Sequence, residues 1–479
     1  MKLFGAGKPD HPMADRKEAR RLLDQLPAHD LKAVEELAHW HESASTAEGF
    51  KPEERAQRIA MIDESGQLRL KKLEREYLAA ARAARGSRAQ ETLLWTRVHE
   101  YWRQAGQAYA RCVDPKSPPE VLLGGLRALG QQLKWQMLRY GPVDPAVWGA
   151  INRTYAAAEA RAVPGAQAEF LKAAMLAASA PDSLLTPELE LAERLIGEFA
   201  SSFALARSPA RELPYWIDLG QAMAPARAVR PPQQAPGLRC FGPGTAAAAL
   251  GGMIERIQSG RGIPSELKLG PQADAEMVLG VMRHLAACWS PVPPERKHAR
   301  HSMKSRLTVT HGFDGVLKAL GGAADSLDFG AGAGGESWTV ENVSAGGFGA
   351  IVPQAKSGWL KVGALVAAQP DGSKHWLVGT VRRVNKLPSQ ETRVGVRTLS
   401  RAPSLSRFAL RSSGEAQGVL LPGPDAGEAA IALRAGVYPP GENLEASVGG
   451  RQHVYMPQGV AERGEDYEIV KFKEMVRES

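Results

Sequence analysis

The sequence predicts a multidomain α+β protein: a large all-α N-terminal domain, then a six-stranded antiparallel β-barrel and a second small β module. Three observations lead to this fold class. The chain has 479 residues, which is too long for a single hydrophobic core. Its first half carries apolar residues at helical spacing, and beyond a proline-rich stretch near residue 290 the apolar period becomes two, as it does in strands.

Residues 1–289 are expected to form the helical domain. Leu94, Val98 and Tyr101 recur at intervals of three or four residues, which places them on one face of a helix. The same pattern elsewhere predicts about seven to nine helices, followed by a small β element near residues 213–242. No motif in this half of the chain names a partner or a pathway.

A proline-rich segment, residues 290–295, is expected to link the helical domain to the β domains, because prolines extend the backbone and stop a helix. The barrel is predicted over residues 296–410, with a glycine-rich loop at 321–335. Its candidate strands are Arg306–His311, Trp338–Val343, Phe348–Val352, Ala364–Ala368, His375–Val384 and Arg393–Leu399. The second module is predicted over residues 415–479. Its candidate strands are Gly418–Leu421, Ile431–Leu433, Leu444–Val448, His453–Met456 and Glu468–Phe472.

Composition and charge narrow the class of protein. With 44% hydrophobic and 23% charged residues, the chain is an ordinary globular protein. The net charge of +8 favours anionic partners. No block of six like charges is present, so a nucleic-acid partner is not expected. Three scattered cysteines, no export signal and no apolar run long enough to span a bilayer predict a cytoplasmic protein.

The residues most informative about function begin at the end of the linker. Arg296 and Arg300 stand four residues apart, just before the first predicted strand. A guanidinium group presents a planar fork of donors that fits a phosphate or the edge of guanine, and its face stacks on a purine. The pair therefore suits an anionic nucleotide.

Asn342, Ser344 and Gly347 follow where one predicted strand ends and the next begins. The asparagine amide can satisfy the donor and acceptor edge of a base, and the serine adds a hydroxyl. Glycine lets a large planar ligand approach the backbone. These groups include no poised general base, nucleophile or metal-ligand set. We therefore expect no enzyme here, and no catalytic residue, metal or cofactor is predicted.

With RxxxR at Arg296 and Arg300 and NxSxxG from Asn342 to Gly347, the chain resembles the PilZ family. The signature of that family is RxxxR followed by (D/N)xSxxG on a six-stranded barrel. The resemblance covers about residues 291–405. It implies that the barrel binds cyclic di-GMP, a bacterial second messenger, often as an intercalated dimer. In the family the arginines grip phosphate and guanine, and the asparagine and serine positions reach a guanine base.

Other residues in this region are secondary candidates or departures from the family pattern. Lys297 and Gly346 lie inside the two motifs and are secondary ligand-binding candidates. Arg382 and Arg383 adjoin on a predicted strand, so one is expected to face the barrel and the other to face away; Arg383 is the ligand-binding candidate. Glu295 stands where many members of the family have a further arginine, and the gap between the motifs is long. It therefore remains open whether each barrel binds one nucleotide or two.

Two further patterns are interpreted as structural. The glycine-rich stretch 329–335 lacks the preceding buried strand and following helix of a dinucleotide-binding loop. The pairs His39/His41 and His298/His301 lack the other ligands that a metal site needs.

We therefore hypothesise a cytoplasmic cyclic di-GMP receptor, in which nucleotide binding to the barrel reorients the helical domain to regulate a protein partner. The alternative is a non-enzymatic scaffold with a degenerate barrel, whose helical domain binds protein or nucleic acid. An enzyme ranks third. The sequence leaves the output pathway, the oligomeric state and the role of the C-terminal β module open.

Overall fold

The computed structural model divides the chain into two compact units, residues 1–294 and 295–479, and each is described by itself. It describes residues 9–82, 87–230, 233–269, 273–293, 295, 298–321, 335–353, 358–412, 414–423, 427–448 and 450–476. The predicted fold class is confirmed: the chain is a multidomain α+β protein, with helices mainly in its first part, followed by two closed antiparallel β-barrels of six strands each.

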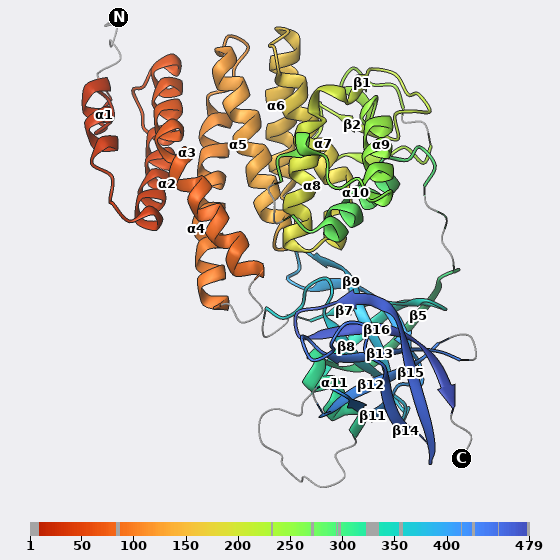
Figure 1. Cartoon of the computed structure of the whole chain (residues 1–479). Coiled ribbons are helices and arrows are strands. Elements are labelled where there is room, and N and C mark those ends of the chain that lie inside the picture. Colours follow the sequence, from red (N-terminus) through yellow and green to blue (C-terminus); the bar gives the residue numbers. More distant parts are fainter. Residues whose placement is uncertain are drawn as a thin grey trace, which may run out of the picture. The chain divides into compact units, whose positions relative to one another are not determined.

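Successive helices pack side by side through most of the first unit (Figure 1). They are α1 (Arg16–Asp24), α2 (Asp30–Thr46), α3 (Pro52–Arg82), α4 (Arg88–Arg111), α5 (Pro119–Met137), α6 (Pro145–Ala160), α7 (Ala166–Ala178) and α8 (Thr186–Glu198). The residues predicted to line one face of a helix do so: Leu94, Val98 and Tyr101 of α4 are all buried. Packing of such faces, more than helix propensity, stabilises helices in a protein.

A small sheet and two more helices complete this unit. The sheet has the strand order β1-β4-β2-β3. Its members are β1 (Ala204–Ala206), β2 (Tyr215–Asp218), β3 (Ala226–Arg227) and β4 (Leu238–Gly242), and the helices are α9 (Ala246–Gln258) and α10 (Ala275–Trp289). Ile217 and Phe241 are buried in the same core as the helices, so the sheet belongs to the helical domain. Among the described helices of the chain, none is both long and apolar enough to cross a membrane.

The second unit begins with the predicted barrel. Its elements are β5 (His301–His311), α11 (Gly312–Gly321), β6 (Glu336–Ser344), β7 (Gly347–Val352), β8 (Leu365–Pro370), β9 (Leu377–Lys386) and β10 (Thr392–Ser400). Every strand pairs antiparallel with its neighbours, and the barrel closes in the order β5-β6-β7-β10-β9-β8. Trp338, Val340, Ala350 and Val394 are buried residues of these strands. Helix α11 is absent from the sequence prediction.

The C-terminal module is a second closed barrel with the same strand connections. Its strands are β11 (Ser404–Leu410), β12 (Gly414–Pro422), β13 (Glu428–Arg434), β14 (Leu444–Val448), β15 (Arg451–Arg463) and β16 (Tyr467–Val476). The order around it is β11-β12-β13-β16-β15-β14. Counted from the first strand of each barrel, both orders read 1-2-3-6-5-4. The chain therefore carries the same barrel topology twice in succession.

Strand β11 falls inside the range 296–410 that the sequence assigned to the first barrel. It pairs with β12 along its whole length and so belongs to the second barrel. The chain passes from β10 to β11 within residues 401–403, and no composition change marks a connection this short. The division between the barrels therefore lies at these residues, not between 410 and 415.

The two barrels share a hydrophobic core. Leu365 and Val378 of the first barrel are buried in one cluster with Val419 and Leu421 of β12, and Phe313 of α11 joins them. The backbone N–H of Phe313 also donates a hydrogen bond of 2.6 Å to the Asp466 carboxylate. Both barrels are consequently packed into one unit.

Candidate functional site

The NxSxxG motif forms the hairpin between β6 and β7. Ser344 ends β6 and pairs with Gly347, the first residue of β7, so that only two residues make the turn. The Ser344 hydroxyl donates a hydrogen bond of 3.2 Å to the carbonyl oxygen of Gly347. A bulge between Val340 and Asn342 shifts the phase of β6, and it places Asn342 on the same face as its partner Gly349.

This hairpin lies tightly against β10. A Cβ atom at Gly347 would lie 2.0 Å from the carbonyl oxygen of Val396, so a larger residue cannot take this position without moving the strand. The Thr398 N–H also donates to the carbonyl oxygen of Gly346 at 3.0 Å. Close packing against β10 therefore explains why glycine stands at both positions, whether or not a ligand binds.

The segment that enters the barrel lies over the same turn. A Cβ atom at Gly346 would lie 3.1 Å from the imidazole ring of His298. Two residues later, Arg300 precedes β5, whose first residue His301 pairs with Val343 of β6. Arg300 is exposed and forms no ion pair with any residue that the structure describes. The structure thus brings Arg300 beside the hairpin.

The two other candidates of the entry segment, Arg296 and Lys297, lie outside the described residues. The primary site residues brought together by the structure are therefore Arg300, Asn342, Ser344 and Gly347.

Two glycines lie next to Asn342 on the outer face of the barrel, and the Asn342 amide covers the first, since a Cβ atom at Gly349 would lie 2.9 Å from its nitrogen. Asn342 pairs with Gly349 of β7, Gly349 with Gly395 of β10, and Gly395 with Arg383 of β9. We call Gly349 and Gly395 the glycine floor. Since neighbouring strands lie about 4.8 Å apart, the floor separates the Asn342 and Arg383 backbones by roughly 14 Å across three strand spacings. A planar base can lie flat on the Gly395 backbone, beside the Asn342 amide.

The paired arginines of β9 differ from the sequence prediction. A bulge opposite Gly395 and Val396 leaves Arg382 and Arg383 both exposed, between the buried Val381 and Val384. The expectation that one of them faces the barrel interior is therefore wrong. Both side chains lie on the outer surface because the bulge breaks the alternation of the strand.

Glu462 of the second barrel reaches the edge of this face. Its carboxylate pairs with Arg397 of β10 and lies 3.6 Å from the guanidinium of Arg382. Arg397 itself stands opposite Gly347 in the strand register. The Tyr467 hydroxyl lies 3.0 Å from Glu462, and burial, with the nearby Glu462 charge, raises the pKa of Tyr467 well above its usual value. Glu462 thus holds two arginines of the first barrel from a position that is only 11% exposed.

Two further arginines near the hairpin are already engaged. Arg393 forms a bidentate pair with Glu341, with distances of 3.0 and 3.3 Å. Arg401 donates to the carbonyl oxygens of Ser344 and Ala345 at 3.3 and 3.1 Å. Arg401 therefore stabilises the turn, and Glu341 neutralises the charge of Arg393.

Sequence reasoning missed the residues that complete this face. Gly349 and Gly395 form its floor, and Arg397 and Glu462 bound it. Glycine inside a predicted strand is a signal that could have found the floor, since it weakens a strand unless something approaches closely. Nothing local to Glu462 indicates that it meets Arg397, 65 residues away in the sequence. Among the described residues, no cluster of His, Cys, Asp and Glu is arranged to hold a metal ion.

Comparison with known proteins points to the other unit. Residues 17–210 match the family model of the N-terminal domain of the cyclic-di-GMP receptor FimW. The match runs from α1 to just beyond β1 and covers less than half of the chain. No curated protein matches the chain. The helical half, in which the sequence analysis found no motif, is therefore similar to a domain that occurs in a cyclic-di-GMP receptor.

Proposed function

We propose that this chain is a cyclic di-GMP receptor of the PilZ type that binds its nucleotide on the outer face of the first barrel. The observation that carries the proposal is the meeting of the two motifs: Arg300 lies beside the hairpin of Asn342, Ser344 and Gly347. The similarity of residues 17–210 to the N-terminal domain of such a receptor supports it from outside the barrel.

Each group has a role that its chemistry suits. The Arg300 guanidinium binds a phosphate or the O6/N7 edge of guanine, with Arg296 of the same motif as its partner. The Asn342 amide pairs with a guanine edge, and the lone pairs of the Ser344 hydroxyl remain free to accept a hydrogen bond. The glycine floor receives the face of the base, and Arg383 stands at its far side. All of these roles are binding roles.

The proposed response is a change in how the helical domain is held. Nucleotide bound by Arg296 and Arg300 fixes the entry segment against the barrel and so restrains residues 290–300, which connect the two units. Because a ligand shifts an equilibrium only by its differential affinity for the two states, this step requires tighter binding to the restrained form. The reoriented helical domain then regulates a protein partner. Three free cysteines fit a chain that works in the reducing cytoplasm.

Calorimetric titration of the full chain with cyclic di-GMP tests the binding proposal. We expect micromolar or tighter binding. Arg300→Ala should weaken it about ten- to a hundredfold, since a hydrogen-bonded charge contributes about 1.5–3 kcal/mol. Arg451→Ala removes an exposed arginine of β15 and is the matched control, expected to bind as the wild type does.

One observation favours the scaffold alternative. The O–H donor of Ser344 and the charges of Arg393 and Arg397 already have partners within the protein, as they would in a barrel that has lost its ligand. Absence of heat with micromolar nucleotide, or equal binding by Arg300→Ala and the wild type, would overturn the receptor proposal and favour the scaffold. Steeply salt-dependent binding of nucleic acid would then identify the partner class.

A further inference from the structure

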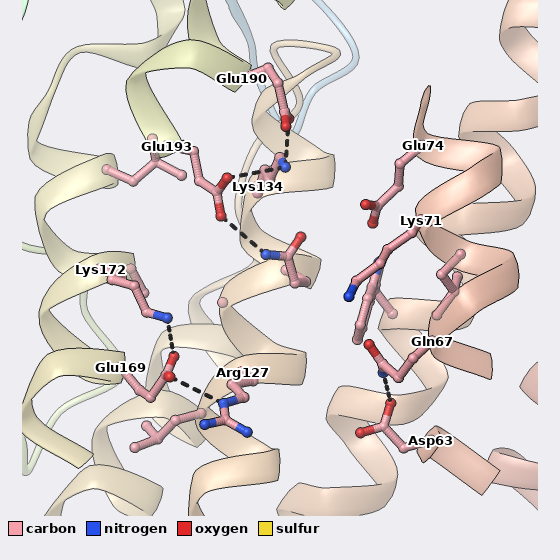
Figure 2. Close-up of a pocket in the computed structure, with 17 residues that line it drawn as sticks. Asp63, Gln67, Lys71, Glu74, Arg127, Lys134, Glu169, Lys172, Glu190 and Glu193 are labelled. Atoms are coloured by element: carbon pink, nitrogen blue, oxygen red, sulfur yellow. Dashed lines mark hydrogen bonds and ion pairs between the residues drawn. The ribbon is translucent and has the colours of Figure 1, made fainter. Parts of the chain in front are cut away.

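The helical domain contains a cavity that the nucleotide proposal does not use. It has a volume of about 510 Å³, within the range of ligand pockets. Figure 2 shows that side chains of α3 line one side and those of α7 and α8 the opposite side, with α5 between them. All of its lining residues lie in one unit of the chain.

One end of the cavity holds more negative than positive charge. The ammonium group of Lys134 lies 2.6 Å from the Glu190 carboxylate and 3.4 Å from that of Glu193. Glu74 of α3 points into the cavity from the opposite wall (Figure 2). No cation lies within ion-pairing distance of Glu74 among the residues that the structure describes. Three carboxylates therefore share one ammonium group at this end, which we call the carboxylate end.

Burial makes this imbalance costly. It raises the pKa of Glu74, Lys134 opposes the rise, and Glu190 and Glu193 add to it. Burial alone would lower the pKa of Lys134, but the three carboxylates outweigh it and raise that pKa. Lys134 is thus a charged ammonium that Glu190 and Glu193 already engage, and the charged form of Glu74 lacks a counterion of its own.

At the other end of the cavity both carboxylates have partners. Glu169 is held by Arg127 at 3.1 Å and by Lys172 at 2.6 Å. Lys71, one turn before Glu74 on α3, lies between Glu74 and Gln67 (Figure 2), and it forms no ion pair in the described part of the chain. The Asp63 carboxylate nearby is engaged by the hydroxyls of Tyr101 and Tyr109 and by Gln67. Carboxylates and cations are therefore equal in number at this end, and the surplus of negative charge lies at the carboxylate end.

We propose that this cavity receives an arginine side chain of a protein partner at the carboxylate end. A guanidinium group is planar and offers donors in a fork, so it can pair with Glu74 and a second carboxylate together. Trp102 lines the same cavity and offers an aromatic surface on which a guanidinium stacks.

Other occupants fit less well. The phosphates of a nucleotide would meet the surplus of carboxylates, and no metal-binding cluster occurs in the described part of the chain. An arginine side chain fills only part of 510 Å³, which leaves room for neighbouring peptide groups. The site lies within residues 17–210, so none of its residues belongs to the barrel.

Titration of the full chain with the blocked peptide acetyl-Ala-Arg-Ala-amide, without nucleotide, tests the proposal. We expect binding in the millimolar range. The same peptide with citrulline, the neutral isostere of arginine, should bind at least about tenfold more weakly because it cannot form the charged pair. Glu74→Gln should weaken the arginine peptide by a similar factor. Glu198→Gln, an exposed glutamate of the same unit, is the matched control.

Glu74→Gln is expected to fold. An acid whose pKa is raised by folding binds more protons in the folded state, so its contribution to stability falls as pH rises through that pKa. Removal of the charge should therefore keep or raise the thermal stability at neutral pH, and lost binding then reflects the lost carboxylate.

Three outcomes would overturn the proposal: no binding up to about 10 mM peptide, equal binding of the citrulline peptide, or unchanged affinity in Glu74→Gln. Free arginine serves as a second probe. If it binds as tightly as the peptide, the cavity is a small-molecule site and the protein partner is excluded. Because no nucleotide is present, the result is separate from the test of the receptor proposal.

Discussion

The two barrels have the same strand order but use their outer faces differently. In the first barrel, β6 and β7 are joined by a two-residue turn and lead to the glycine floor. In the second barrel, the corresponding strands β12 and β13 carry Val419, Leu421 and Ala432, which are buried against the first barrel. Strand β12 ends in Pro422, and no NxSxxG motif occurs in the chain there.

This difference teaches that the barrel topology alone does not create the candidate site. A few positions on an otherwise common fold decide whether a face binds a ligand or packs against a neighbour. One copy has small and polar residues on that face, and the other has apolar ones. The second barrel also contributes Glu462 to the rim of the first, so the copies are interdependent.

The largest effect is expected from breaking the shared core. Leu421 is 2% exposed in the cluster that joins the barrels. Leu421→Ala should lower the free energy of unfolding of this unit by about 2–5 kcal/mol, because it removes buried methyl groups and leaves a cavity. Hydrogen exchange measured peptide by peptide in the full chain should then show lost protection in both barrels, including β6 and β7.

Met475→Ala is the control for this substitution, because Met475 of β16 is 51% exposed and its truncation should change little. If Leu421→Ala loosens β12 and β13 while the exchange of β6 and β7 stays as in the wild type, the barrels are independent units and the comparison fails.

A second substitution should remove the difference between the two faces. A Cβ atom at Gly395 would meet the Cβ atom of Arg383 at 3.4 Å, which is ordinary contact, so Gly395→Val should fold. Its isopropyl group would cover the glycine floor. We expect the dissociation constant of cyclic di-GMP to rise at least about thirtyfold, equivalent to about 2 kcal/mol, with little change in thermal stability.

Gly358→Val makes the same chemical change where a Cβ atom has no neighbour within 4 Å, and it should bind nucleotide normally. Wild-type affinity in a folded Gly395→Val protein would show that the ligand does not lie on the floor, even if the chain is a receptor.

Much of the fold could be predicted because its signals are local. All six predicted strands of the first barrel overlap β5–β10, since alternation and glycine-rich turns lie within each strand. Helix α11 was missed because it is short, lies between two glycines and owes its burial to tertiary packing against both barrels. Strand β11 was assigned to the wrong barrel because its pairing with β12 is set by tertiary structure and leaves no signal within the strand itself.

The candidate site was predictable only where residue type and spacing carry the chemistry. Arg300, Asn342, Ser344 and Gly347 follow a pattern that can be read along the chain. The pairing of Gly349 with Gly395 depends on the register between β7 and β10, and no local sequence pattern predicts that register. The helical cavity combines side chains from five helices, and the charge imbalance there exists only after those helices have packed.

The smallest effect is expected from loosening the contact between the second barrel and the candidate site. Glu462→Gln removes the charge that holds Arg397 and Arg382 but keeps an acceptor for the Tyr467 hydroxyl. Both arginines are about half exposed, so the loss of stability should stay near 1 kcal/mol or less.

The affinity for the dianionic nucleotide should rise about three- to tenfold at low salt, because two uncompensated cations then lie beside the floor, and the gain should shrink at high salt.

Glu465→Gln makes an equal change in net charge on a carboxylate that pairs with Lys361. Calorimetry of both variants therefore separates a local from a general effect of charge. A rise in Glu462→Gln alone would mean that the second barrel restrains the receptor face. A fall would mean that Glu462 positions Arg397 for the ligand, and equal changes in both variants would leave the second barrel a packing partner only.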